Sequence, residues 1–224
     1  MKKLHFILLL FVCLCFSCSD NETIYSCDET TNKWVKKNIS TIRTMSREQW
    51  KSLNINKKIA AFRVFSKEQR ISFWKDKINE TLKLDWSKSE KAHILKLYWF
   101  IINNTDMFSD DVMTDEMRDK YDLFFYDWVE TAKNKLKWDM KTIVSIAASG
   151  EELVDKNGIS SNTFGFEDSS GDIIDVSCHC NITYDFCSVP FNNASCIDTK
   201  CEGTTTGCGW LLINPCNGRC DDIL

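Results

Sequence analysis

Proline and glycine are nearly absent from most of this chain. Among its 224 residues there are two prolines and eight glycines, with no proline before residue 190 and no glycine before residue 150. Both residue types interrupt helices, proline because it has no backbone donor and glycine because it loses the most conformational freedom on folding. The long stretch without either therefore lacks the usual helix breakers and favours uninterrupted helices.

Histidine is scarce as well. The three histidines are His5, His93 and His179, and no zinc-protease, nucleophile-elbow or phosphate-loop motif accompanies them. We therefore expect no enzymatic activity, no metal site and no cofactor.

The net charge is −4, and residues 18–150 carry a surplus of only three positive charges. That surplus is too small to neutralise a phosphate backbone, so nucleic acid is not an expected partner.

Cysteine is missing between residues 28 and 177, yet eight of the twelve cysteines lie within residues 178–220. An oxidising compartment would turn such a cluster into disulfides, whereas a reducing cytosol would favour metal ligands or catalytic thiols. The N-terminus distinguishes these cases. Two lysines precede an apolar run from about residue 6 to residue 16, which is too short to span a bilayer as a stable helix. Residues 1–17 are therefore predicted to be a secretory signal peptide.

The signal ends in Ser17 and Cys18 and resembles a bacterial lipoprotein signal. In lipoproteins the cysteine after the cleavage site carries diacylglycerol, so the resemblance makes Cys18 the lipid attachment site and the membrane a partner. Cys15 departs from the pattern, because leucine usually stands at that position. The alternative is an ordinary secreted precursor that is cut nearby.

Residues 18–27 are predicted to be an acidic tether. The sequence SDNE at residues 19–22 resembles the export signal that sends Bacteroidota lipoproteins to the outer face of the outer membrane. That resemblance implies an outer-membrane location with exposure at the cell surface, while a plain solvated tether is the alternative. Cys27 is the odd thiol of the mature chain, and a free or intermolecularly bridged state is open.

Residues 28–150 are predicted to form a domain of about five helices. Ser46, Ser66 and Ser87 each precede a glutamine or glutamate by three residues, a capping-box pattern that marks a helix start. Seven tryptophans lie in this region, and we expect them to form a core rather than a ligand groove. Apolar residues recur every three or four positions. They are Ile71, Trp74, Ile78 and Leu82, then Leu95, Tyr98 and Ile102, then Met117, Tyr121, Phe124, Trp128, Ala132 and Leu136.

Residues 151–177 differ from the helical region. They contain three glycines, several serines and a net charge of −6, a composition typical of an exposed linker where proteases cut. The acidic groups do not fit the spacing of a twelve-residue calcium loop, so calcium binding is not expected.

Residues 178–224 are predicted to form a small disulfide-rich module with short β-strands. The spacing of its cysteines lacks the paired C-x2-C ligands of a zinc site and the C-x-x-C of a redox site, which favours four disulfides. Because the segment has few apolar residues, we expect crosslinks to supply its stability in place of a core. The pairing is open, since eight cysteines allow 105 connectivities. The cysteines are Cys178, Cys180, Cys187, Cys196, Cys201, Cys208, Cys216 and Cys220.

The module resembles the fulvocin C-related bacteriocin family of Bacteroidota. The shared features are the opening Cys178-His-Cys180, the sequence YDFC ending at Cys187, TTTGCGW at residues 204–210 and the closing Cys216-Asn-Gly. The match covers about a fifth of the chain. It implies an antibacterial module carried on a larger exported precursor, with the helical domain as a carrier, an immunity-like partner or a stalk.

The resemblance also implies a surface that contacts a target-cell receptor or membrane. Residues 210–213 would form an exposed apolar strand, and a second patch would lie in the YDFC sequence; alternatively, both are the core of the module itself. The residues concerned are Tyr184, Phe186, Trp210, Leu211, Leu212 and Ile213. Residues 178–224 carry a net charge of −3, which favours a receptor over disruption of anionic membranes.

The chain as a whole is thus expected to be mainly helical, with a small crosslinked module at its end. The leading functional hypothesis is a surface lipoprotein that presents a bacteriocin-like antibacterial module. The alternative is a non-toxic surface lipoprotein whose module recognises a protein or glycan. The sequence does not indicate an oligomeric state.

Overall fold

The computed structural model describes residues 23–111, 113–158, 180–189, 194–199 and 205–222. As predicted, it is mainly helical, with short strands near the C-terminus. The α-helices are α2 (Glu29–Ile42), α3 (Arg47–Lys51), α4 (Ile55–Val64), α5 (Lys67–Thr81), α6 (Lys88–Asn103), α7 (Asp115–Asn134) and α8 (Met140–Ala147). Within the described ranges there are thus seven α-helices rather than about five, with α3 and α8 being short.

The capping-box serines begin helices where the sequence predicted them. Ser46, Ser66 and Ser87 precede α3, α5 and α6, and each serine hydroxyl accepts a hydrogen bond from the backbone of the third helical residue. The side chain of that residue bonds back to the serine backbone, so two open donors are satisfied at each start. The prediction of these three helix starts is confirmed.

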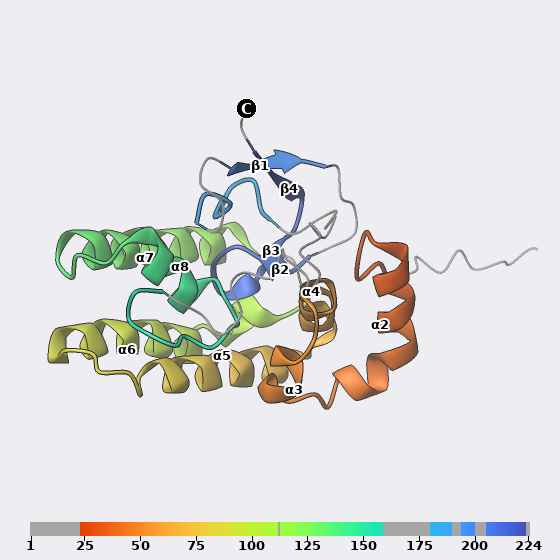
Figure 1. Cartoon of the computed structure of the whole chain (residues 1–224), viewed down its shortest axis with the longest axis horizontal. Helices are drawn as coiled ribbons and strands as arrows, with labels where there is room; N and C mark the ends of the chain where they lie inside the picture. Colours follow the sequence, from red (N-terminus) through yellow and green to blue (C-terminus); the bar gives the residue numbers. More distant parts are fainter. Residues whose placement is uncertain (1–22, 112, 159–179, 190–193, 200–204, 223–224) are drawn as a thin grey trace, which may run out of the picture.

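The described residues of the C-terminal segment form two small antiparallel sheets. One pairs β1 (Ala194–Asp198) with β4 (Gly218–Asp222), and the other pairs β2 (Gly207–Cys208) with β3 (Asn214–Pro215). Between β2 and β3 lies the 3-10 turn η2 (Trp210–Leu212), and a second 3-10 turn, η1 (Thr105–Phe108), follows α6. In Figure 1, β1 and β4 lie at the outer edge, whereas β2, β3 and η2 lie centrally among the helices.

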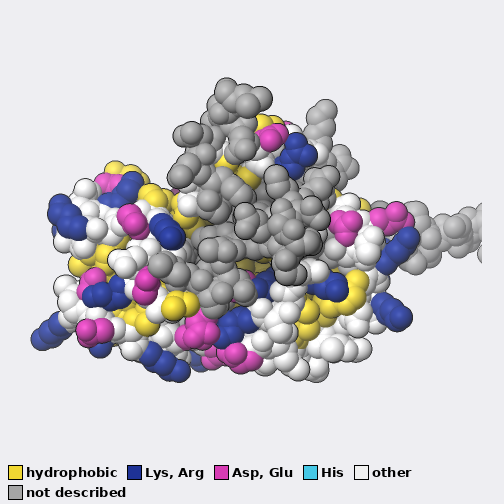
Figure 2. Space-filling model, in the orientation of Figure 1, with side chains coloured by type: hydrophobic (Ala, Val, Ile, Leu, Met, Phe, Trp, Pro, Cys, Tyr) yellow, Lys and Arg dark blue, Asp and Glu magenta, His cyan; other side chains and the backbone are white. Residues whose placement is uncertain are grey.

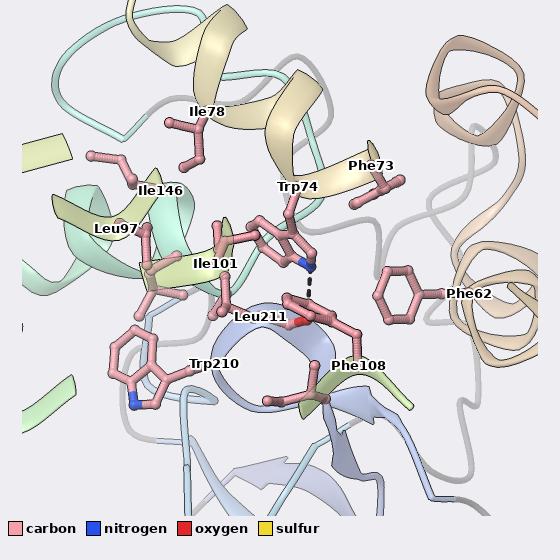
Figure 3. Close-up of a cluster of buried hydrophobic side chains, with 14 of the residues drawn as sticks. Phe62, Phe73, Trp74, Ile78, Leu97, Ile101, Phe108, Ile146, Trp210 and Leu211 are labelled. Carbon is pink, nitrogen blue, oxygen red and sulfur yellow. Dashed lines mark hydrogen bonds between the residues drawn. The ribbon is translucent and has the colours of Figure 1, made fainter. Parts of the chain in front are cut away.

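The helices and the C-terminal segment share one hydrophobic core. Trp210 and Leu211 of η2 are buried in the same cluster as Trp74, Leu97 and other residues of the helices. Figure 3 shows the turn enclosed by side chains from several helices. The expectation that crosslinks replace a core in this segment is therefore wrong for its central part, because the helices supply the apolar surface that the segment itself lacks.

The chain after α8 also packs against the helices. Glu151 is buried, and Gly150 lies so close to Trp50 that an added Cβ would be 2.6 Å from the indole. The prediction of an exposed linker is consequently wrong for Glu151 and Leu153, which are buried, whereas Val154, Lys156 and Asn157 are exposed as predicted. Residues 159–177 lie outside the described ranges.

Helix α6 buries a different stripe from the predicted one. Ile94, Leu97 and Ile101 are fully buried, whereas Leu95 is 38% exposed and Trp99 is 56% exposed. The helix is apolar around most of its circumference, so periodicity alone does not determine which side faces the core. Five of the seven tryptophans of the helical region are buried as expected, the exceptions being Trp34 and Trp99.

Leu211→Ala is expected to destabilise the helices as well as the C-terminal segment. Leu211 is 0% exposed, and truncation of such a leucine leaves a cavity that costs about 2–5 kcal/mol. We expect that loss in the free energy of unfolding, measured by urea denaturation with helical circular dichroism as the signal. The control is Leu123→Ala, because Leu123 is 67% exposed on α7. An equal effect of both substitutions would contradict the shared core.

Candidate functional site

The η2 turn is held inside the helices by two side-chain donors. Trp74 Nε1 donates to the Leu211 carbonyl over 2.7 Å, as drawn in Figure 3, and the Tyr121 hydroxyl donates to the Trp210 carbonyl over 2.8 Å. Burial raises the pKa of the Tyr121 phenol, so its proton is retained for this bond. Asn214 Nδ2 in turn donates to the Tyr121 oxygen over 2.8 Å.

The segment predicted as an exposed contact strand is thus neither a strand nor exposed in the folded chain. Trp210, Leu211 and Ile213 are at most 7% exposed, and Leu212 is half-buried. The exposed-strand interpretation is wrong because helices far away along the chain cover this segment. The alternative, that these residues are core, agrees with their burial, but the core is shared with the helices.

The second predicted patch also joins the C-terminal segment to the helices. Tyr184 is half-buried, and its hydroxyl donates to the Asp122 carboxylate on α7. Phe186 packs against Trp210 with ring centroids 4.4 Å apart. Tyr184 therefore joins the C-terminal segment to α7, whereas the contact of Phe186 with Trp210 lies within the C-terminal segment.

A cleft remains between the helices and the C-terminal segment. It holds about 840 Å³ of space, part of it open to solvent, and its lining is largely apolar. One wall comes from α3, α4 and the chain after α8, and the other from the loop after Cys180 and from the β2–η2 turn. The main apolar residues of the lining are Trp50, Ile55, Ile59, Tyr184, Phe186 and Leu212.

A buried ion pair forms the polar part of the cleft. Lys58 Nζ lies 2.6 Å from Glu151 Oε1, and both side chains are at most 9% exposed. The same ammonium lies 5.3 Å from the centre of the Trp50 ring, which provides a cation–π contact. The pair holds the chain after α8 against α4, so it fixes the distance between two parts of the cleft wall.

Two further basic side chains bind the backbone of the chain after α8. Arg47 donates from Nε and Nη2 to the Gly150 carbonyl over 3.1 and 2.8 Å, and Lys77 donates to the Glu151 carbonyl. Burial, followed by the nearby Arg47, lowers the pKa of Lys77 to about 7, while Glu80 and Glu151 oppose this shift. Lys77 is therefore close to losing its proton at neutral pH.

Among the described residues, three disulfides crosslink the C-terminal segment. Cys180–Cys196 and Cys187–Cys220 attach the loop of residues 180–187 to both strands of the β1–β4 sheet, and Cys208–Cys216 closes the hairpin that carries η2. Six of the eight predicted disulfide cysteines are thus paired. Cys178 and Cys201 lie outside the described residues, as does the predicted lipid cysteine, Cys18.

The closing Cys-Asn-Gly motif has a packing role in this arrangement. Gly218 pairs with Cys180, and a Cβ added to Gly218 would lie 2.5 Å from Cys196 Sγ. A larger residue would therefore displace the disulfide. The sulfurs of Cys180, Cys187 and Cys196 come within 4.8 Å of one another, but their disulfide bonds explain this proximity without a metal ion.

His93 belongs to the core. Its ring stacks on Trp128 with centroids 4.8 Å apart, and Nε2 lies 3.0 Å from the Trp128 carbonyl. Burial lowers the pKa of His93 to about 4, with Lys96 adding to the shift. The imidazole is therefore neutral near pH 7. His179 lies outside the described residues.

The buried basic residues were missed by the sequence analysis. Arg70, Lys77 and Arg63 are at most 8% exposed, although charged residues are rarely buried. A signal was present, because Arg70 and Lys77 occur seven residues apart on the same apolar stripe as Trp74 and Ile78. When a basic residue lies within the apolar stripe of an amphipathic helix, it indicates a buried cation that needs hydrogen-bond acceptors.

Comparison with known proteins finds no relative: no family model, no curated protein and no solved structure matches the chain. Within the described ranges, none of the helices combines the length and apolarity needed to cross a membrane. On the face in Figure 2, acidic and basic side chains are interspersed over the helices, and neither sign forms one large patch among the coloured residues.

Lys77→Met is expected to reduce the rise of stability with pH. The folded chain holds the Lys77 proton less tightly than the unfolded chain, in which lysine titrates near 10.5. Stability therefore increases as the pH rises from about 7 towards 10 and decreases as it falls back to 7, by on the order of 1 kcal/mol per pH unit. Below pH 7 both states are protonated and this dependence ends.

The measurement is the free energy of unfolding in urea at several pH values from 6 to 10. The difference between the wild-type chain and Lys77→Met should grow in favour of the wild type as the pH rises. Lys75→Met, which removes a partly exposed lysine from the same helix, should leave the slope unchanged. A slope that is identical in all three chains would show that Lys77 does not titrate in this range.

Proposed function

We propose that this chain is an exported, lipid-anchored surface protein that binds a protein partner through the cleft between its helices and its crosslinked C-terminal segment. The observation that carries the proposal is the burial of Trp210 and Leu211 in the helical core. Each large apolar side chain contributes about 2 kcal/mol on burial. The C-terminal segment therefore acts together with the helices as one body.

The export part of the proposal rests on the N-terminal sequence. The signal-like residues 1–17 and the candidate lipid cysteine Cys18 suit a surface lipoprotein, and disulfides suit the oxidising space that such a protein enters. The acidic sequence at residues 19–22 supports the outer face of the outer membrane.

The cleft supports a protein partner rather than a glycan. Its lining is largely apolar, and its charged pair, Lys58 with Glu151, is already satisfied internally. Ligand-binding sites on proteins are usually apolar clefts with a few polar groups. An apolar lining of this kind favours an aliphatic or aromatic side chain of a partner.

A second candidate function is the antibacterial module implied by the resemblance to fulvocin C-related proteins. One observation favours it: the helices cover the apolar segment around Trp210. A carrier domain that keeps a toxin inactive would cover the toxin in the same way. In that case the module has to be cut from the helices and then withdrawn from their core. Non-covalent contacts oppose this withdrawal, and we therefore place it second.

The cleft proposal is tested with Ile55→Glu in the chain of residues 19–224. A carboxylate in the apolar cleft is expected to weaken binding to intact cells of the producing and related strains by at least about tenfold, since tenfold corresponds to only about 1.4 kcal/mol. Val154→Glu is the matched control, because Val154 is 55% exposed and does not line the cleft. Equal binding by both variants would reject the cleft as the binding site.

The two candidate functions are separated with the oxidised fragment 177–224. We expect this fragment neither to compete with the intact chain for cells nor to inhibit the growth of related strains. Growth inhibition by the fragment, together with its release into the culture medium, would replace the binding proposal with the antibacterial one.

A further inference from the structure

In the part of the chain that the structure describes, the buried basic side chains either pair with a carboxylate or can lose their proton, with one exception. Within the described residues, Arg47 pairs with Glu80 and Arg70 pairs with Asp110, at 2.6 and 2.8 Å. Lys58 has its own carboxylate partner in the cleft, and Lys77 can lose its proton near neutral pH. Arg63 is only 8% exposed and forms none of the ion pairs found among the described residues.

The guanidinium of Arg63 lies where three segments meet. Nε donates to the Thr206 carbonyl over 2.9 Å, and Nη1 donates to the Tyr25 carbonyl over 2.6 Å. The third nitrogen, Nη2, is buried without a hydrogen-bond partner, and so is the hydroxyl oxygen of Thr206. Two unmatched polar groups thus occur on residues that are already bonded to each other.

Cys27 does not supply the missing negative charge. Burial raises the pKa of the Cys27 thiol, and the opposing influence of Arg63 is smaller, so the thiol is neutral at pH 7. Burial also lowers the pKa of Arg63, to about 10, which leaves the guanidinium charged at neutral pH. The result is a buried positive charge next to neutral groups.

A buried charge without a counter-ion is costly, and proteins compensate for it by pairing. We propose that Arg63 Nη2 and the Thr206 hydroxyl bind a small inorganic anion, a halide or an oxyanion such as phosphate. A guanidinium offers several donors in a fixed plane, which suits an acceptor-only ligand, and the hydroxyl adds one more donor.

The position of this site gives the anion a structural role. Thr206 directly precedes β2, Tyr25 precedes α2, and Arg63 lies in the last turn of α4. An anion there would neutralise the cation that holds these three segments together. The site is separate from the proposed partner site, because neither Arg63 nor Thr206 lines the cleft, so the two proposals can fail independently.

The proposal is tested by thermal unfolding of the chain of residues 19–224 in chloride or phosphate, at an ionic strength held constant with a bulky sulfonate. Binding to the folded state alone raises the melting temperature with anion concentration. We expect a saturable rise for the wild type and none for Arg63→Gln. Arg43→Gln is the matched control, because Arg43 is exposed at the end of α2, and it should behave as the wild type.

A second variant keeps the test decisive if Arg63→Gln does not fold. Thr206→Val removes the hydroxyl but retains the carbonyl that Arg63 binds, and it should raise the apparent dissociation constant of the anion by about tenfold. A wild-type melting temperature that is the same in every anion would overturn the proposal. An unchanged anion response in Thr206→Val and in every folded Arg63 variant would do so as well.

Discussion

The insertion of the η2 turn into the helical core is the contact on which the rest of the structure depends. Leu211 and Leu212 both have a φ of 55°, a left-handed conformation that is unfavourable for leucine. Within the turn, the Trp210 carbonyl accepts only a long backbone bond, 3.4 Å from Ile213 N, and buried carbonyls require good donors. Trp74 and Tyr121 provide those donors from two different helices. The helices thus stabilise one particular conformation of the C-terminal segment, in addition to covering its apolar side chains.

A second constraint follows from the near absence of glycine in the helical region. Without glycine, helices cannot readily end in the left-handed caps that satisfy their last carbonyls. Side chains of neighbouring helices take this role. Arg70 donates to the Phe62 and Arg63 carbonyls at the end of α4, and Gln69 donates to the Ile42 carbonyl at the end of α2. The burial of Arg70 therefore follows from the way α4 ends, and its bonds fix α5 against α4.

The sequence predicted those features that local chemistry determines. The capping boxes identified three helix starts, because each box involves residues within one turn. The composition of the C-terminal segment indicated disulfides, but their pairing depends on which strands meet, and cysteine spacing does not contain that information. The buried face of α6 was ambiguous for a related reason, since apolar residues such as Leu95 and Leu97 lie on opposite sides of that helix.

The candidate site was the least predictable part, because its walls come from distant parts of the chain. Trp210 and its neighbours suggested an exposed surface only while their partners, 89 and 137 residues away in sequence, were unknown. Lys58 and Glu151 gave no local signal, since each is an ordinary charged residue until the chain after α8 folds back onto α4.

The disulfides and the helical core perform different tasks in the C-terminal segment. Cys208–Cys216 closes a short hairpin around the left-handed turn, which limits the conformations that the turn explores before it meets the helices. The other two disulfides lie outside this hairpin and hold the loop of residues 180–187 to the β1–β4 sheet. Apolar burial then acts on a turn that already has its shape, so less conformational entropy is lost when the turn enters the core. Crosslinks alone would leave Trp210 and Leu211 exposed to water, and the core alone would have to order a flexible loop. The combination explains how a segment with so few apolar residues becomes an integral part of a helical protein.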